Sequence, residues 1–182
     1  MEPTMLKIIA GVAIVLVVAI AVVLVLAATR PDTFRIERSA TIDAPAEKIF
    51  AVLSDFHQWG GWSPWEKKDP DMKRSFTGAG RGKGAVYGWE GDKNVGTGRM
   101  EILEASTPSR LVIKLDFLKP FEAHNTAEFT MLPQGNATNV HWVMHGPSPM
   151  MAKVMHVFIN MDKMVGKDFE QGLANLKQLT EK

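Results

Sequence analysis

Histidine is the residue type in this sequence best suited to metal binding, and His141 and His145 are spaced as an HxxxH pair. On a helix this spacing places both imidazoles on one face, where they can share a metal ion. The residues around them alternate between apolar and polar, which indicates a strand, and four residues of strand span about 13 Å. The rings are then too far apart for one ion, so we predict neither a metal site nor a cofactor. His57 and His124 stand alone and are expected to be surface or capping residues.

Acid–base catalysis would need titratable side chains that face a pocket. The sequence has no Cys and no GxSxG motif, so we expect neither a thiol nucleophile nor a hydrolase-type serine. Asp55 and His57 are too close in sequence to act as a relay without a third partner. Arg38 and Tyr87 are the remaining catalytic candidates, because both fall on the apolar, inward-facing parity of predicted strands.

The segment Gly80–Ala85 matches a GxGxxA string, which in dinucleotide-binding proteins follows a buried strand and opens a helix. Here the residues that follow, Val86–Trp89, have the pattern of a strand. We therefore interpret the string as a hairpin turn. The net charge of +1, with acidic and basic residues mixed along the chain, gives no indication of a nucleic-acid partner.

A long C-terminal helix, predicted from Met161 to Leu179, is the element that must organise these side chains. Its apolar residues recur at intervals of three and four, which places them on one face of an α-helix. Because such a stripe needs an apolar surface to cover it, the middle of the chain must supply a flat partner. The stripe consists of Met161, Met164, Val165, Phe169, Leu173, Leu176 and Leu179.

Strand-like runs separated by short, often Gly-rich turns supply that flat surface. Apolar residues alternate with polar ones along them, which predicts an antiparallel sheet with one apolar and one wet face. A short helix starting at Asp43-Ala44-Pro45 follows the first run. The fold class is therefore α+β. The runs are Phe34–Ile42, Lys73–Thr77, Ala85–Trp89, Gly98–Ala105, Arg110–Phe117, Asn125–Leu132 and Thr138–His145.

The segment Ile8–Ala28 contains no charged residue and is long enough, as a helix, to cross a bilayer of about 30 Å. A cleaved signal peptide is the alternative, since Val25-Leu26-Ala27 is compatible with cleavage, although an apolar signal core usually has about 7–15 residues. We predict an uncleaved single-pass anchor between a tail, residues 1–7, and a linker, residues 29–33. Residues 34–182 would then form one domain, expected to be monomeric.

The side of the membrane follows from the charges that flank this segment. Lys7 precedes it, whereas Arg30, Arg35 and Arg38 follow it, and the positive-inside rule then favours a cytoplasmic C-terminal domain. The absence of Cys rules out a disulfide framework and suits a reducing compartment.

Several motifs together resemble a known protein family over about residues 34–182. The chain is similar to polyketide cyclase/dehydrase-type members of the START-related SRPBCC superfamily. The segment near the C-terminus is the most specific of these motifs. They are Ile42-Asp43-Ala44-Pro45, Trp62-Ser63-Pro64-Trp65, Gly84–Gly91, Gly96–Met100 and Gly166–Lys177.

This resemblance implies a helix-grip fold, in which a curved seven-stranded antiparallel sheet surrounds the C-terminal helix and encloses an apolar cavity. Members include lipid carriers, cyclases and simple binding modules, so the fold leaves the function open. We expect a module that binds a lipid or another hydrophobic small molecule. The alternatives are a cyclase/dehydrase-like enzyme and a protein-interaction domain with a filled cavity. The expected ligand-binding residues are Tyr87, Trp89, Leu115, Phe117, Phe129 and Trp142 of the sheet and Met161, Val165 and Phe169 of the helix.

Two further segments have more than one interpretation. Trp59–Trp65 holds three Trp residues, which can form a packed corner, the rim of a pocket or a membrane contact. Met150–Phe158 is a Met-rich helical stretch that can pack in the core or line an adaptable pocket.

Overall fold

The computed structural model describes residues 3–182, and the chain divides into two compact units. The larger unit consists of Arg35–Pro147 and Asp162–Lys182. The smaller unit consists of the chain up to Phe34 together with Ser148–Met161. The two units are described separately below.

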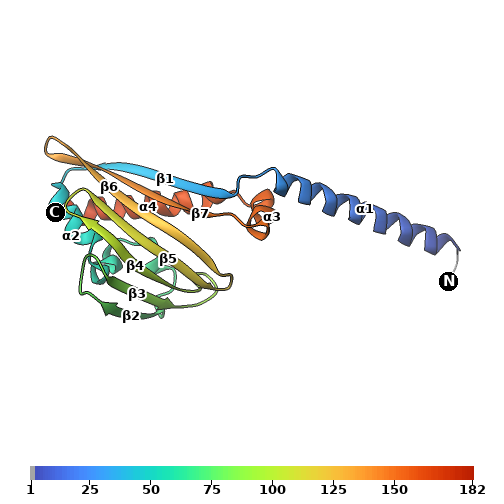
Figure 1. Cartoon of the computed structure of the whole chain (residues 1–182), viewed down its shortest axis with the longest axis horizontal. Coiled ribbons are helices and arrows are strands. Elements are labelled where there is room, and N and C mark those ends of the chain that lie inside the picture. The colour runs from blue at the N-terminus through green and yellow to red at the C-terminus, as the bar shows by residue number, and fades with distance from the viewer. Residues whose placement is uncertain (1–2) are drawn as a thin grey trace. The chain divides into compact units, whose positions relative to one another are not determined.

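The larger unit is built on a seven-stranded sheet in the order β1-β7-β6-β5-β4-β3-β2. Neighbouring strands from β2 to β7 pair antiparallel, and consecutive strands are adjacent, as the short turns predict. The predicted fold class is therefore confirmed, with strand ends within a few residues of the expected ones. The strands are β1 Thr33–Ile42, β2 Lys73–Gly78, β3 Ala85–Glu90, β4 Thr97–Ser106, β5 Arg110–Lys119, β6 Ala123–Gln134 and β7 Ala137–Pro147 (Figure 1).

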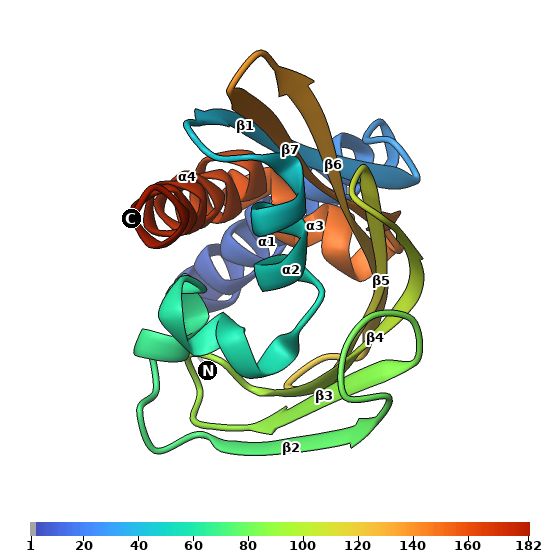
Figure 2. The same ribbon diagram turned by 90° about the vertical axis from the view of Figure 1, so that its left-hand side faces the viewer.

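Helices cover the concave side of this sheet. Figure 2 shows the sheet curling around α4 and around the short α2, which is the arrangement expected of a helix-grip fold. Two 3₁₀ turns follow α2 and complete the same layer. The elements are α2 Ala46–Leu53, η1 Phe56–Gly61, η2 Pro64–Lys67 and α4 Met161–Thr180.

The buried face of α4 differs in part from the predicted stripe. Phe169, Leu173 and Leu176 are buried as expected, whereas Met164 is exposed. Two glycines take its place on the buried face. A Cβ atom on Gly172 would lie 2.8 Å from the Trp142 ring, and one on Gly166 would lie 2.0 Å from the Arg38 guanidinium. The helix approaches the sheet closely at these glycines, which apolar periodicity alone does not reveal.

The smaller unit contains α1, Pro3–Ala28, and α3, Met150–Phe158. From Lys7 to Ala28, α1 is long and apolar enough to cross a membrane, a property that N-terminal signal sequences share. Helix α3 packs against α1. The backbone N–H of Ser148 also donates a hydrogen bond of 2.7 Å to the carbonyl of Asp32. This bond joins the start of the segment Ser148–Met161 to the part of the chain that follows α1.

Candidate functional site

The inward-facing side chains of the sheet become more accessible toward one end. On β5, Leu111 and Ile113 are fully buried, Leu115 remains 9% exposed, and Phe117 is half-buried. Residues opposite them on β4 and β6 follow the same order, because the antiparallel register sets Leu111 against Phe129 and Leu115 against Asn125. Solvent access to the inward-facing side chains therefore increases from one end of the concave face to the other.

Helix α4 shows the same gradient along its length. Leu176, Leu173 and Phe169 are buried, and Val165, one turn earlier, is half-buried. We call the two regions the closed end and the open end. The closed end consists of Trp62, Ile102, Leu111, Ile113, Phe129, Trp142 and Phe169, and the open end of Trp89, Met100, Leu115, Phe117, Asn125, Met144 and Val165.

Aromatic rings fill the closed end. Trp142 stacks on Phe169 with ring centroids 4.0 Å apart and planes at 4°, so the sheet and α4 touch directly. Trp142 also stacks on Phe129 at 4.9 Å and meets Trp62 edge-on at 5.4 Å. Three of the predicted ligand-binding residues, Phe129, Trp142 and Phe169, therefore lie together in close ring contact.

The Trp-rich segment supplies the rest of this packing. Trp59 and Trp62 lie with ring centroids 4.8 Å apart, and both are buried. Trp65 meets both Trp142 and Phe169 edge-on, at 5.8 and 6.1 Å. The segment thus forms a packed corner, which is one of the interpretations its sequence allowed.

The open end holds most of the other predicted residues. Tyr87, Trp89 and Phe117 form a row of rings, with centroids 6.1 Å and 5.8 Å apart. The indole N–H of Trp89 donates to the carbonyl of Val95 at 3.0 Å, which fixes the ring. Leu115 faces inward beside this row. Met161, another of the predicted residues, begins α4 and belongs to the smaller unit.

Tyr87 is held by a partner that the sequence did not indicate. Its hydroxyl donates to Glu66 Oε1 at 2.6 Å, and Arg74 Nε donates to Glu66 Oε2 at 2.7 Å. Burial, followed by the hydrogen bond to the carboxylate, raises the pKa of Tyr87 above its usual value. The phenol therefore keeps its proton at neutral pH. Glu66 was missed because it lies 21 residues from Tyr87, in a turn without periodic pattern.

Arg38, the other catalytic candidate, is engaged with the start of α4. Its Nε donates to Glu170 Oε1 at 2.7 Å and its Nη1 to Asp162 Oδ1 at 2.9 Å. The hydrogen bonds to Asp162 and Glu170 raise the pKa of Arg38. Arg38 thus joins β1 to α4 across Gly166, and its guanidinium is already paired with two carboxylates.

Three further polar side chains face the interior of the larger unit. Among residues 3–182, the indole N–H groups of Trp62 and Trp142 are buried without a hydrogen-bond partner, which is uncommon for a buried donor. Asn125 lies on the inward face of β6, and its Oδ1 lies over the backbone of Gly146. Trp62 and Trp142 belong to the closed end, whereas Asn125 lies at the open end, where the polar part of a ligand can orient toward it.

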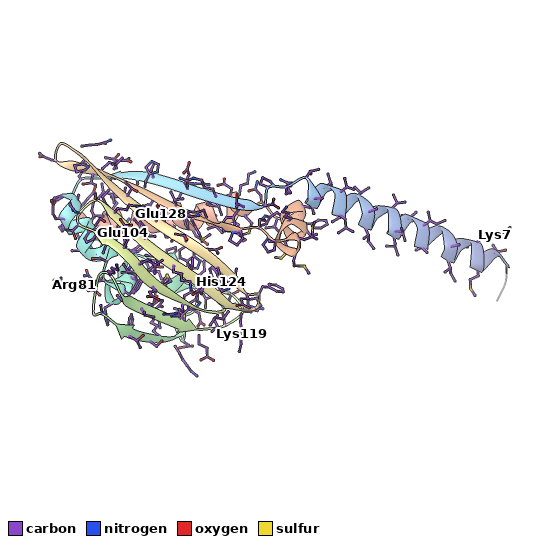
Figure 3. The ribbon with its side chains drawn as sticks, viewed as in Figure 1. Lys7, Arg81, Glu104, Lys119, His124 and Glu128 are labelled. Carbon is purple, nitrogen blue, oxygen red and sulfur yellow. The ribbon has the colours of Figure 1, made fainter. Side chains whose placement is uncertain are left out.

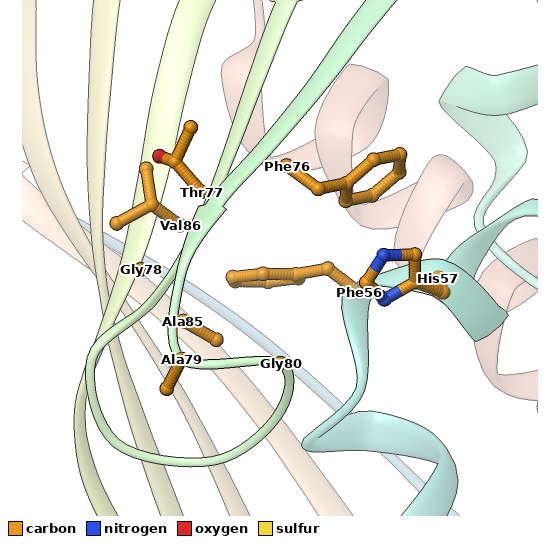
Figure 4. A pocket seen from close by; sticks show the side chains of 9 residues that line it. All are labelled: Phe56, His57, Phe76, Thr77, Gly78, Ala79, Gly80, Ala85 and Val86. Atoms are coloured by element: carbon orange, nitrogen blue, oxygen red, sulfur yellow. The ribbon is translucent and has the colours of Figure 1, made fainter.

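A small pocket lies between η1 and the β2–β3 hairpin (Figure 4). The rings of His57 and Phe76 stack at its edge, 4.2 Å apart. Its volume of about 110 Å³ is below the roughly 300–1,000 Å³ of ligand pockets in general. It is too small for a lipid. The GxGxxA string contributes to this hairpin loop and not to a helix start.

His124 and His145 lie beside carboxylate side chains on the outer face of the sheet. His124 Nδ1 lies 2.7 Å from Asp116 Oδ1, and His145 Nε2 lies 3.0 Å from Glu128 Oε1. Figure 3 labels one member of each pair, His124 and Glu128. Within residues 3–182, no group of three or more His, Cys, Asp or Glu side chains is arranged to hold a metal ion.

Comparison with known proteins gives a family and a fold. A family model described as "Polyketide cyclase / dehydrase and lipid transport" matches residues 33–181. No curated protein sequence matches the chain.

Solved structures agree with the fold at low sequence identity. Protein CV1439 from Chromobacterium violaceum is 16% identical, with 84% of this chain and 99% of that chain covered and a TM-score of 0.57. A protein from Thermobifida fusca is 20% identical, with 80% and 92% covered and a TM-score of 0.59. The di-domain ARO/CYC protein BexL of the BE-7585A biosynthetic pathway is 16% identical, with 86% and 53% covered and a TM-score of 0.59.

Proposed function

The chain belongs to the polyketide cyclase/dehydrase and lipid transport family, and we propose that its domain binds a lipid or another hydrophobic small molecule at the open end. In this proposal the domain is tethered to a membrane by α1. The ligand would lie between the inward face of strands β3 to β6 and the N-terminal turns of α4, within the part of α4 that belongs to the larger unit. The family and its fold support hydrophobic ligand binding as the general role of the domain.

The gradient of accessibility along the concave face is the observation that carries the proposal. Leu115 and Phe117 face inward with the rest of the core, yet they keep contact with solvent that Leu111 and Ile113 have lost. Each Å² of apolar surface removed from water stabilises by roughly 25 cal/mol, so a hydrophobic ligand that covers these side chains is favoured. Asn125 supplies a polar contact beside them.

The closed end would act as the floor of this site. Its rings are in direct contact, so a ligand would not pass between Trp142 and Phe169 without separating them. The contacts with ligand then fall mainly on Tyr87, Trp89, Leu115, Phe117 and Val165. In this proposal Phe129, Trp142 and Phe169 support those residues from below.

A membrane anchor accounts for α1 better than a cleaved signal does. An apolar signal core usually has about 7–15 residues, whereas the uncharged segment Ile8–Ala28 is longer and reaches the length of a bilayer-spanning helix. Arg30, Arg35 and Arg38 follow α1 and only Lys7 precedes its apolar part, which supports a cytoplasmic domain.

Native mass spectrometry of the full chain in detergent-free nanodiscs tests the binding function. We expect a monomeric protein that retains one apolar small molecule, and a Val165→Trp variant that folds but loses it. Met164→Trp is the matched control, because Met164 is the adjacent residue of α4 and is exposed. Absence of any retained molecule, together with no response of Trp fluorescence to oleic acid or cholesterol, would contradict the proposal.

A cyclase-type enzyme is the second candidate, and the Tyr87–Glu66–Arg74 cluster is the observation that favours it. The Tyr87 hydroxyl is a proton donor near the open end. Its raised pKa and its bond to an ion-paired carboxylate make it a better positioning group than a general acid at neutral pH. Turnover of a bound molecule that Tyr87→Phe abolishes, while retention of the molecule persists, would favour the enzyme.

A further inference from the structure

Helix α3 has an unusual distribution of side chains within the smaller unit. Met151, Met155 and Phe158 recur at intervals of four and three, so they share one face of the helix. This face is directed to the outside: Met151 is 69% and Phe158 72% exposed. Helices on the surface of a soluble protein normally present polar residues to water. The Met-rich segment is therefore not packed in a core, which was one of its two interpretations.

The polar residues of α3 are turned inward instead. Lys153 is 7% exposed, and its Nζ donates to Asp32 Oδ1 at 2.5 Å. His156 is half-buried, and burial, followed by the charge of Arg30, lowers its pKa. A surface helix in water normally has its apolar face inward and its polar face outward, and α3 has the opposite arrangement. This arrangement suits a helix whose outer face contacts an apolar environment.

The position of α3 in its unit indicates what those surroundings are. It packs against α1, whose apolar segment ends at Ala28. The backbone bond between Ser148 and Asp32 and the Lys153–Asp32 pair hold α3 to the chain immediately after that end. If α1 spans a bilayer, Asp32 lies at the level of the lipid headgroups, and α3 lies beside it.

We propose that α3 is a second membrane-binding element, which lies in the headgroup region with Met151, Met155 and Phe158 directed into the acyl chains. Helices of this kind bury their apolar face about 5–10 Å below the headgroups. The proposal rests on the membrane anchor proposed for α1. The Lys153–Asp32 pair would keep the single charge of the helix on the side opposite the lipid.

Site-directed spin labelling of the full chain in nanodiscs of phosphatidylcholine and phosphatidylglycerol tests this directly. The protein has no Cys, so single substitutions Met151→Cys and Phe158→Cys each carry one nitroxide. Val18→Cys, within α1, reports on the anchor, and Lys167→Cys, exposed on α4, is the reference for water. Collision rates with oxygen and with a water-soluble nickel chelate then give the depth of each label.

We expect the labels at Met151 and Phe158 to collide with oxygen at least several times more often, relative to nickel, than the label at Lys167. Nickel access at Met151 and Phe158 with Val18 protected would overturn the role of α3 and leave the anchor intact. Nickel access at Val18 would overturn both proposals. Labels at Met151 and Phe158 that are protected from both reagents and broadened by a neighbouring spin would indicate a second copy of the chain, and would equally contradict lipid contact.

Discussion

The closed end and the open end of the concave face are built from the same strands and the same helix, yet they are packed differently. At the closed end, Trp142 and Phe169 stack at 4.0 Å and little apolar surface remains accessible. At the open end, Phe117 and Val165 are only half-buried. Four residues of α4, about 6 Å of helix, separate Phe169 from Val165. Stability and ligand binding are therefore expected to depend on neighbouring turns of one helix.

The largest effect is expected at the closed end. Phe169→Ala removes a fully buried ring that contacts Trp142 and Trp65, and should lower the free energy of unfolding by about 3–5 kcal/mol. Urea titration followed by Trp fluorescence measures it. All five Trp residues lie in the larger unit, so the signal reports on that unit.

Lys167→Ala is the matched control for this substitution. Lys167 is exposed on the same helix, and its loss should change stability by no more than about 0.5 kcal/mol. Similar losses from both variants would show that the closed end is not the stabilising contact of α4.

The second effect concerns binding at the open end. Val165→Trp should lower the affinity for an apolar ligand about 100-fold, or about 2.8 kcal/mol, because the indole occupies the proposed ligand volume. It should change stability less than Phe169→Ala does, since Val165 is half-buried and its surroundings are not closed. Titration of the full chain with a fluorescent fatty acid gives the affinity.

Two outcomes would contradict the proposed difference in packing and ligand binding between the closed end and the open end. A Val165→Trp variant that unfolds would show that the open end is as tightly packed as the closed one, which favours the filled interaction domain. A Met164→Trp variant that loses binding equally would show that the effect is not specific to the inward face of α4.

The general architecture was predictable because its signals are local. Alternation along Arg110–Phe117 and intervals of three and four along α4 depend only on near neighbours in the sequence, and they placed the strands and the helix correctly. The family motifs added the helix-grip arrangement. Such patterns do report which side chains face inward.

The candidate site was less predictable because it depends on distances across the fold. The division of the predicted lining into two ends arises from sheet curvature and from the Trp59–Trp65 corner, neither of which leaves a periodic signal. The Tyr87–Glu66 pair joins residues 21 apart, and the Lys153–Asp32 pair joins residues 121 apart. Because the latter turns Lys153 inward, the outward apolar face of α3 could not be inferred from its sequence alone.

A smaller effect is expected from Tyr87, in the row of rings at the open end. Tyr87→Phe removes the hydrogen bond to Glu66 but keeps the ring contacts with Phe56 and Trp89. Hydrogen bonds to charged groups contribute about 1.5–3 kcal/mol, and the remaining Arg74–Glu66 pair should keep the loss near the lower value. Urea titration measures the loss, and unchanged ligand affinity would place the hydroxyl outside the binding site.

The smallest effect is expected on the outer face, at His124 and Asp116, where neither end is involved. The hydrogen bond to Asp116 raises the pKa of His124 above 6.5. Burial raises the pKa of Asp116, but the bonds from His124 and Lys114 outweigh it and lower the pKa below 3.8. The histidine therefore contributes stability that is complete below about pH 6.5 and lost as the pH rises through its folded pKa, whereas the carboxylate's contribution is lost only as the pH falls below about 3.8.

The pair should thus stabilise the domain most between about pH 4 and 6.5. We expect the urea midpoint of the wild type to exceed that of His124→Gln at pH 5.5, and this difference to shrink as the pH rises through the raised pKa of His124. Comparing the two proteins at each pH cancels the titration of other groups, including His156, whose depressed pKa acts in the opposite direction. Ligand affinity should be the same for both proteins, because His124 lies on the face of β6 opposite the open end. Weaker ligand binding by His124→Gln at pH 5.5 would show that the charged side chains on the outer face of the sheet stabilise the conformation of the open end. The two faces of the sheet would then be coupled at this position.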